Sequence, residues 1–153
     1  MINNLFRDMI RAQIFDFKRA AGKSGRVCAV TGKELPHSDI HIDHVYPLTF
    51  DSIKHEFLRT HGLEICDIKT KVQWCGRYPK IFPVQIAVDE QITTAFQELH
   101  MKRAVLRPVS AKINWAAART INYGGMDPEK VREELIQVYP QWHLISLMGP
   151  TKC

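Results

Sequence analysis

Apolar residues recur three and four positions apart along much of the chain, which is the spacing of a helix with one buried face. Leu5, Met9, Ala12 and Phe15 form such a stripe near the beginning, and Gly22 follows it. Spacing and helix-end signals together predict five helices. They are residues 4–21, a helix that begins after Thr49, and the segments 89–103, 110–120 and 127–138.

Three of these helices have recognisable first residues. The side chains of Thr49 and Asp89 can accept a hydrogen bond from a backbone N–H of the first turn, which otherwise has no partner. Asp127 precedes Pro128, and proline suits the first helical position because an N–H there would have no helical acceptor. The last helix is therefore predicted to open at Pro128.

Two short segments have the composition of strands. Residues 26–30 and 40–45 contain several β-branched residues and flank a turn at 31–33, so the sequence predicts a hairpin with a wide loop. Pro47 has no N–H to donate and ends the second strand. Between 63 and 88, Gly76, Pro79 and Pro83 break any period, which indicates short strands or loop.

The composition is that of one globular domain, and the predicted helices and strands give it an α+β fold. The chain has 153 residues, of which 45% are hydrophobic and 24% charged, without repeats or low-complexity tracts, and this excludes a fibrous or disordered protein. No apolar run approaches the roughly 18 residues that a membrane helix needs, and the first residues lack signal-peptide features. We therefore expect a cytoplasmic protein without a membrane partner.

Positive charge is concentrated in two acid-free runs, within a chain of formal net charge +5. Residues 99–126 contain five cations that we expect to contact nucleic-acid phosphates: Lys102, Arg103, Arg107, Lys112 and Arg119. Residues 68–88 interleave four cations with Trp74, Tyr78 and Phe82. This second run is typical either of a nucleic-acid contact with stacked rings or of solvated loops whose aromatics serve the core.

Asp43, His44 and Asn114 together have the chemistry of a metal-dependent hydrolase. A carboxylate and a carboxamide oxygen are ligands that Mg²⁺ accepts while it keeps several waters. A neutral imidazole beside such an ion can take a proton from water. We therefore expect Asp43 and Asn114 to hold one Mg²⁺ or Mn²⁺ ion and His44 to act as the general base.

The predicted strand geometry conflicts with this site. Neighbouring residues of a regular strand point to opposite faces, so Asp43 and His44 should not reach the same cleft. We therefore expect the strand pairing to break near this point, where Pro47 makes a strand end or bulge plausible. Asn114 should then arrive from a helix packed across the strands.

The segments around these residues resemble the HNH nucleases, whose fold is the ββα-metal unit. The Asp43-His44 pair resembles the metal ligand and general base of that family. The run 106–114, Leu-Arg-Pro-Val-Ser-Ala-Lys-Ile-Asn, resembles the segment of phage and homing-type enzymes that ends in a metal-binding asparagine. Residues 28–32 resemble the first strand, but Thr31 stands where a zinc-binding cysteine is often found, so no structural zinc is expected.

The resemblance implies a single nuclease domain with a hairpin packed on a helix as its core. That core would comprise residues 26–47 and 99–120, with 48–98 as a long, mostly helical insertion. Residues 1–25 would add an N-terminal helix, and 126–153 a C-terminal helix and tail.

The sequence departs from the family pattern at two places. His44 and Asn114 lie much farther apart than the compact motif requires, which is why an insertion is inferred. Val105 stands where the family commonly has an asparagine that holds the base histidine, and His100 is a candidate to replace it. His41, on the strand face of Asp43, is either a further support of the site or an ordinary strand residue.

The expected activity is hydrolysis of DNA by a monomer or weak dimer that nicks one strand, because only one such set of residues occurs in the chain. The alternative is a non-catalytic nucleic-acid-binding protein with a degenerate HNH fold. A protein-binding module that meets an acidic partner is a third possibility.

Overall fold

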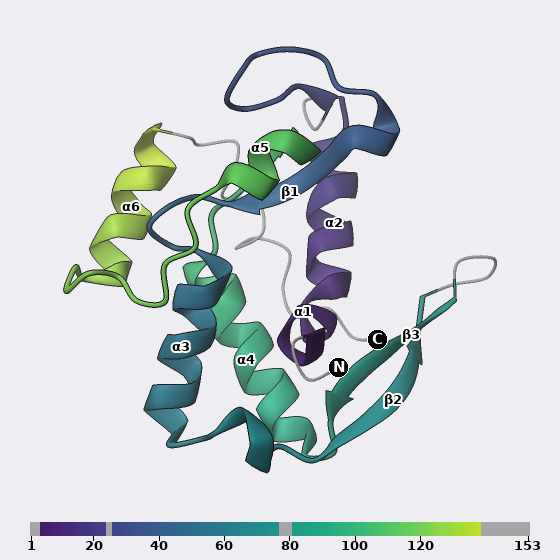
Figure 1. Ribbon diagram of the computed structural model, residues 1–153, viewed down its shortest axis with the longest axis vertical. Helices are drawn as coiled ribbons and strands as arrows, with labels where there is room; N and C mark the ends of the chain where they lie inside the picture. The colour runs from purple at the N-terminus through teal and green to yellow at the C-terminus, as the bar shows by residue number, and fades with distance from the viewer. Residues whose placement is uncertain (1–3, 24–25, 77–80, 139–153) are drawn as a thin grey trace.

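The structure, a computed structural model, describes residues 4–23, 26–76 and 81–138 and has an α+β fold (Figure 1). The helices of this part are α1 (Leu5–Met9), α2 (Arg11–Ala21), α3 (Phe50–His61), α4 (Glu90–Arg103), α5 (Ala111–Ala116) and α6 (Pro128–Val138). The strands are β1 (Ile40–His44), β2 (Thr70–Cys75), β3 (Phe82–Ala87) and β4 (Leu106–Ser110). Short 3-10 helices, η3 (His37–Asp39) and η4 (Ile65–Asp67), precede β1 and β2. The predicted C-terminal tail, 139–153, lies outside the described residues.

The predicted helix starts are confirmed by their hydrogen bonds. The side chain of Thr49 accepts the N–H of Ser52 at 3.2 Å, and that of Asp89 accepts the N–H of Gln91 at 3.0 Å. Asp127 caps α6 in the same way. These starts were readable because a cap involves only neighbouring residues. None of the described helices is long and apolar enough to cross a bilayer.

Two predicted helices are shorter than the sequence indicated. The segment 4–21 is divided at Ile10, whose φ of −102° and ψ of 1° leave the helical region, so that α1 and α2 are separate helices. The helix that begins after Ser110 ends at Ala116 instead of 120, because Ala117 is extended. A polar cluster described below fixes the chain beyond Ala117 in that extended course.

The predicted hairpin between 26–30 and 40–45 is wrong, because β1 pairs antiparallel with β4. His41 lies opposite Val109 and Asp43 opposite Arg107. Residues 26–30 form only an isolated bridge between Val27 and Glu34, and one further hydrogen bond joins the backbone of Ala29 to that of Pro108 in β4. Short-range turn signals predicted the nearest partner, whereas burial of Leu106, Pro108 and Val109 in β4 favours the distant one.

The insertion between the paired strands is only partly helical. It contains α3, the antiparallel β2–β3 pair and most of α4. Figure 1 shows the β2–β3 pair apart from the β1–β4 pair, and β3 packs against α1. There the N–H of Gln85 donates to Asp8 Oδ2 at 2.9 Å. The expectation of a mostly helical insertion is therefore corrected to a mixed one.

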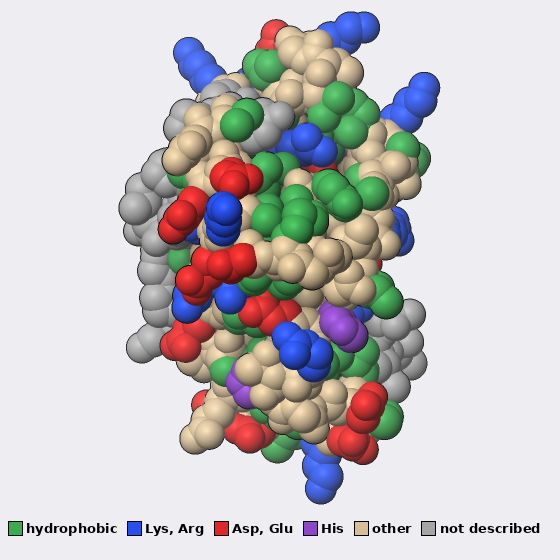
Figure 2. All heavy atoms as spheres, turned by 90° about the vertical axis from the view of Figure 1, so that its left-hand side faces the viewer, with side chains coloured by type: hydrophobic (Ala, Val, Ile, Leu, Met, Phe, Trp, Pro, Cys, Tyr) green, Lys and Arg blue, Asp and Glu red, His purple; other side chains and the backbone are tan. Residues whose placement is uncertain are grey.

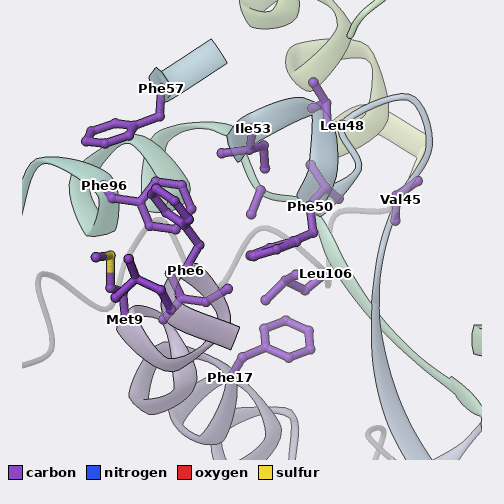
Figure 3. Close-up of a cluster of buried hydrophobic side chains, with 14 of the residues drawn as sticks. Phe6, Met9, Phe17, Val45, Leu48, Phe50, Ile53, Phe57, Phe96 and Leu106 are labelled. Carbon is purple, nitrogen blue, oxygen red and sulfur yellow. The ribbon is translucent and has the colours of Figure 1, made fainter. Parts of the chain in front are cut away.

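The hydrophobic core joins α1, α3 and α4 to the adjoining ends of β1 and β4 (Figure 3). Phe6 meets the rings of Phe96 and Phe57 edge to face, with centroids 4.7 and 5.9 Å apart. Leu106, the first residue of β4, and Val45, which follows β1, are buried in the same cluster. Burial of these apolar side chains anchors the end of β1 at which Asp43 and His44 lie.

A buried polar cluster ties the chain after α5 to the start of α3. Thr49 Oγ1 donates to the carbonyl oxygen of Thr120 at 2.8 Å, and Ser52 Oγ lies 3.1 Å from the carbonyl oxygen of Asn122. Ser52 is completely buried. These bonds fix residues 117–122 against α3 and thereby hold the end of α5 beside β1.

We predict that Ser52→Ala destabilises the protein by about 1 kcal/mol, because the hydrogen bonds of this buried hydroxyl to Thr120 and Asn122 are lost. Urea unfolding followed by circular dichroism measures the change. Ser38→Ala, at an exposed serine, is the matched control and should leave the unfolding free energy nearly unchanged. Equal effects of the two substitutions would contradict the role assigned to the cluster.

Candidate active site

A cavity of about 440 Å³ lies where β1, α5 and the starts of α2 and α3 meet. The predicted site residues Asp43, His44 and Asn114 all line it, as does His41. Other parts of the wall come from α1, from the first turn of α3, from α5 and from the segment that follows α5: Arg7, Asp51, Trp115 and Arg119 among them. Three segments far apart in the sequence therefore contribute polar side chains to one space.

Asp43 and His44 reach this cavity without any break in the strand pairing, so the predicted break is wrong. The ladder is regular through His44, which lies opposite Leu106, and the N–H of Val45 still donates to the carbonyl oxygen of Val105 at 2.8 Å. In the described residues β1 pairs only with β4, so its other edge is open. Four consecutive residues of β1, 41 to 44, line the cavity, so both faces of the strand contribute to its wall.

His44 is held from behind by a chain of buried hydrogen bonds. Its Nε2 lies 2.8 Å from Nε2 of His100, and Nδ1 of His100 lies 2.7 Å from Oε1 of Gln13. Nε2 of Gln13 donates to the backbone oxygen of Gln97 at 3.1 Å. His100 and Gln13 are both completely inaccessible to solvent. His100 was the sequence candidate for this support, whereas Gln13 was missed because its partners are remote in the sequence.

These contacts define the position of each proton. The Gln13 amide donates through its nitrogen, so its oxygen must accept from Nδ1–H of His100. Nε2 of a neutral His100 is then an acceptor, and it receives the Nε2–H of His44. Nδ1 of His44 is therefore left with a lone pair. The chain of bonds selects the tautomer of His44 in which Nδ1 is available to a water in the cavity.

Burial also keeps both imidazoles neutral. Desolvation and the nearby charge of Arg7 together lower the pKa of His44 to about 3, against the opposing effect of Asp51. Desolvation likewise holds the pKa of His100 well below its usual value, and repulsion between the two rings when protonated is a second cause. A neutral His44 is the form that can accept a proton.

Asn114 is oriented by His41. Its Nδ2 lies 3.1 Å from Nδ1 of His41, so the amide nitrogen donates to the ring and the carbonyl oxygen remains an acceptor. The indole of Trp115 meets the His41 ring edge to face, with centroids 6.1 Å apart, and is 70% exposed. His41 thus contacts a predicted site residue, Asn114, and fixes the direction in which its amide points.

Asp43 is engaged by Arg107, the residue opposite it in β4. Both Nε and Nη2 of Arg107 contact the same carboxylate oxygen, Oδ2, at 2.9 Å. Burial raises the pKa of Asp43, although the hydrogen bond and charge of Arg107 act in the opposite direction. Arg107 was expected to contact phosphate, but in the structure its guanidinium aligns the candidate metal ligand.

The donor atoms suit a hard cation. No group of three or more His, Cys, Asp or Glu side chains within the described ranges is arranged to hold a metal ion. Magnesium, however, commonly takes only one or two protein oxygens and completes its shell with water. The carboxylate of Asp43 and the amide oxygen of Asn114 are two such oxygens lining the same cavity.

The cations predicted to contact nucleic acid separate into two groups. Arg103 is buried and binds Glu56, with Nη2 to Oε1 at 3.0 Å, and Lys102 pairs with Glu129 at 3.3 Å. Arg103 is therefore a structural residue, and its assignment as a nucleic-acid contact is wrong. Lys112 and Arg119 are exposed. Figure 2 shows acidic and basic side chains mixed on the face that carries α3 and α6, so that face is not a basic surface.

Arg7 is a cation of the site that sequence analysis missed. It lies in α1 and lines the cavity, with its guanidinium 4.5 Å from the centroid of the Phe50 ring. The stripe of apolar residues identified α1 as a helix, but it gave no sign that the helix would lie beside β1. Only the tertiary packing brings Arg7 to His44.

The second acid-free run makes mainly structural contacts where it is described. Lys71 pairs with Glu90 at 3.0 Å, and Phe82 packs edge to face on Phe15 at 5.5 Å. Trp74 is 68% exposed. The cations and the tyrosine at 77–80 lie outside the described residues.

Comparison with known proteins identifies no relative: no family model, no curated protein and no solved structure matches the chain. The function is therefore argued from the site itself.

The hydrogen-bond chain predicts one tautomer for each buried histidine. Nitrogen-15 NMR spectra that correlate ring nitrogens with ring protons should show His44 protonated at Nε2 only and His100 at Nδ1 only. Exposed His55 should show exchange-averaged tautomers and is the control. A proton on Nδ1 of His44 would refute the assigned chain.

The two neutral imidazoles predict a loss of stability in mild acid. The folded-state pKa of His100 lies below its unfolded value of about 6.5, so the unfolded state binds the extra proton and stability falls as pH drops below that value. Each imidazole contributes at most about 1.4 kcal/mol per pH unit to the slope of the unfolding free energy against pH.

Urea unfolding between pH 7.5 and 5.5 tests this, because few carboxyl groups titrate in that window. In His100→Gln the amide can keep both hydrogen bonds but cannot titrate. The slope of the unfolding free energy against pH should therefore fall by the contribution of one bound proton. An unchanged slope in this variant would show that His100 does not titrate as the structure requires.

Proposed function

We propose that this protein is a metal-dependent DNA endonuclease of the HNH type. The observation that carries the proposal is the arrival of Asp43, His44 and Asn114 at one cavity from β1 and α5. The order of the elements supports it as well, since two antiparallel strands, β1 and β4, are followed directly by α5. That order is the one expected of a ββα-metal core, with the insertion placed between its two strands.

Asp43 and Asn114 are the residues that would hold the ion. A bound Mg²⁺ would supply Lewis-acid stabilisation of the charge that develops on the phosphate and on the departing oxygen. Arg107 fixes the orientation of the Asp43 carboxylate, and His41 fixes that of the Asn114 amide.

His44 is the general base of the proposed reaction. Its Nδ1 takes a proton from a water molecule, the water oxygen bonds to phosphorus, and the bond from phosphorus to the 3′ oxygen breaks while that oxygen takes a proton from solvent. The products are a 5′ phosphate and a 3′ hydroxyl. The Nε2–H bond to His100 prevents the ring from presenting its protonated nitrogen to the water. Arg7 and Arg119 line the cavity and are placed to neutralise phosphates of the bound strand.

The second candidate function is a nucleic-acid-binding protein without catalysis. One observation favours it: Arg107 already pairs with Asp43, as would be expected if that carboxylate had only a structural role. In this case the positive side chains at the cavity bind the phosphate backbone and no ion is needed.

A plasmid assay separates the two functions. With Mg²⁺, the wild-type protein should convert supercoiled plasmid to the nicked form, and a chelator should stop the reaction. His44→Ala should lower the rate by about 10²–10⁴-fold, as expected for loss of a general base, while DNA affinity changes little. His44→Gln, which retains a donor for His100, guards against a folding defect.

His55→Ala is the control, because His55 is exposed on α3 and outside this cavity. Asp43→Asn should also lose activity. DNA binding without any metal-dependent nicking by the wild type would reject the nuclease and support the binding protein.

A further inference from the structure

A second cavity, of about 320 Å³, lies at the other end of α2 and is strongly basic. Its wall contains four side chains that can carry positive charge and no acidic one: Lys18, Lys23, Arg26 and His37. Gly22 and Ile40 complete the wall. Nothing in the proposed chemistry uses this cavity.

The positive charge of the cavity is not neutralised within the described part of the chain. No ion pair there involves Lys18, Lys23 or Arg26. Of the acids close to these residues in the sequence, Asp39 accepts the N–H of Ala111 at 3.0 Å and Asp16 pairs with Arg19, and neither forms an ion pair with a cation of the cavity.

The geometry holds one of these charges in place. Lys18 is half-buried, and its Nζ donates to the backbone oxygen of Ile40 at 3.0 Å. An ammonium group has three donors, so two remain for a ligand. The C-terminal end of α2 contributes a partial negative charge of roughly half a unit, which three full positive charges outweigh. The cavity therefore favours an anion with several acceptor oxygens, which is the chemistry of a phosphate.

Both cavities have part of their wall on α2 and part on β1. Ile10 and Ile14 line the first, while Lys18 and Gly22 line the second, and residues four apart lie on one face of a helix. Ile14 and Lys18 are separated by about 6 Å along the axis of α2. One strand of B-DNA carries a phosphate about every 3.4 Å along the duplex axis. The walls of the two cavities therefore adjoin along α2 and, at Ile40 and His41, along β1, so that one strand can pass over both.

We propose that the second cavity binds a backbone phosphate of the same DNA strand whose phosphodiester enters the first cavity. The choice of DNA rests on the proposed function. The contact positions the strand and carries no sequence information, because it involves only phosphate.

Binding of a labelled DNA duplex in EDTA tests the proposal without requiring cleavage. The double variant Lys23→Gln/Arg26→Gln removes two cations of the cavity and leaves Lys18, with its structural hydrogen bond, in place. The matched control, Lys33→Gln/Lys130→Gln, removes two exposed cations outside both cavities and changes the net charge equally.

The cavity variant should bind DNA about 10-fold or more weakly, and the slope of log K against log salt should fall by about 1–2, as expected for lost phosphate contacts. The control should change affinity less than 2-fold. Thermal unfolding of both variants establishes that they are folded. Equal affinity and equal salt slope in the two variants would overturn the proposal.

A second arm identifies the source of the phosphate. Phosphorus NMR titration with inorganic phosphate tests a free anion as the ligand. Tight phosphate binding that the cavity variant loses, together with unchanged DNA affinity, would mean a site for free phosphate and would refute the DNA contact. A wild type that binds DNA through the cavity but never nicks it would leave this inference intact and defeat the nuclease. A wild type that binds no DNA would defeat both.

Discussion

The antiparallel pairing of β1 with β4 is the constraint on which the rest of the structure depends. It brings together the two ends of the insertion and places Arg107 directly opposite Asp43. It also positions α5, which carries Asn114, beside β1. The entropy of closing a long loop rises only slowly with its length, so an insertion of this size is tolerable provided that it packs. It does pack, because α3 and α4 supply Phe57 and Phe96 to the core that buries the start of β4.

The buried histidine pair shows how the core and the site are coupled. A polar ring inside a hydrophobic cluster is costly unless each of its nitrogens has a partner, and His100 has one on each side, Gln13 and His44. The same bonds that make His100 tolerable in the core fix the tautomer of His44 at the cavity. The support of His44 therefore comes from the last turn of α4, where His100 lies.

Sequence analysis identified the local features and missed those that depend on packing. The first residues of α3, α4 and α6 were predictable because caps involve neighbours, and Asp43, His44 and Asn114 were predictable as a chemical set. The partner of β1 was not, since residues 26–30 and 106–110 both have strand-like composition. Gln13 in α2 and Arg7 in α1 are site residues only because of tertiary contacts. Arg103, in contrast, is a structural residue, because Glu56 neutralises its charge.

The charges around the first cavity determine how far the binding of a phosphate would depend on a metal ion. Asp43 is neutralised by Arg107 and Asp51 by Lys54, both through direct ion pairs, and burial keeps His44 neutral. Arg7 and Arg119 are then the uncompensated charges of the wall in the described part of the chain, so the cavity is positive before any ion enters. A phosphate strand is therefore attracted by protein side chains alone, whereas an ion has to share the Asp43 carboxylate with Arg107.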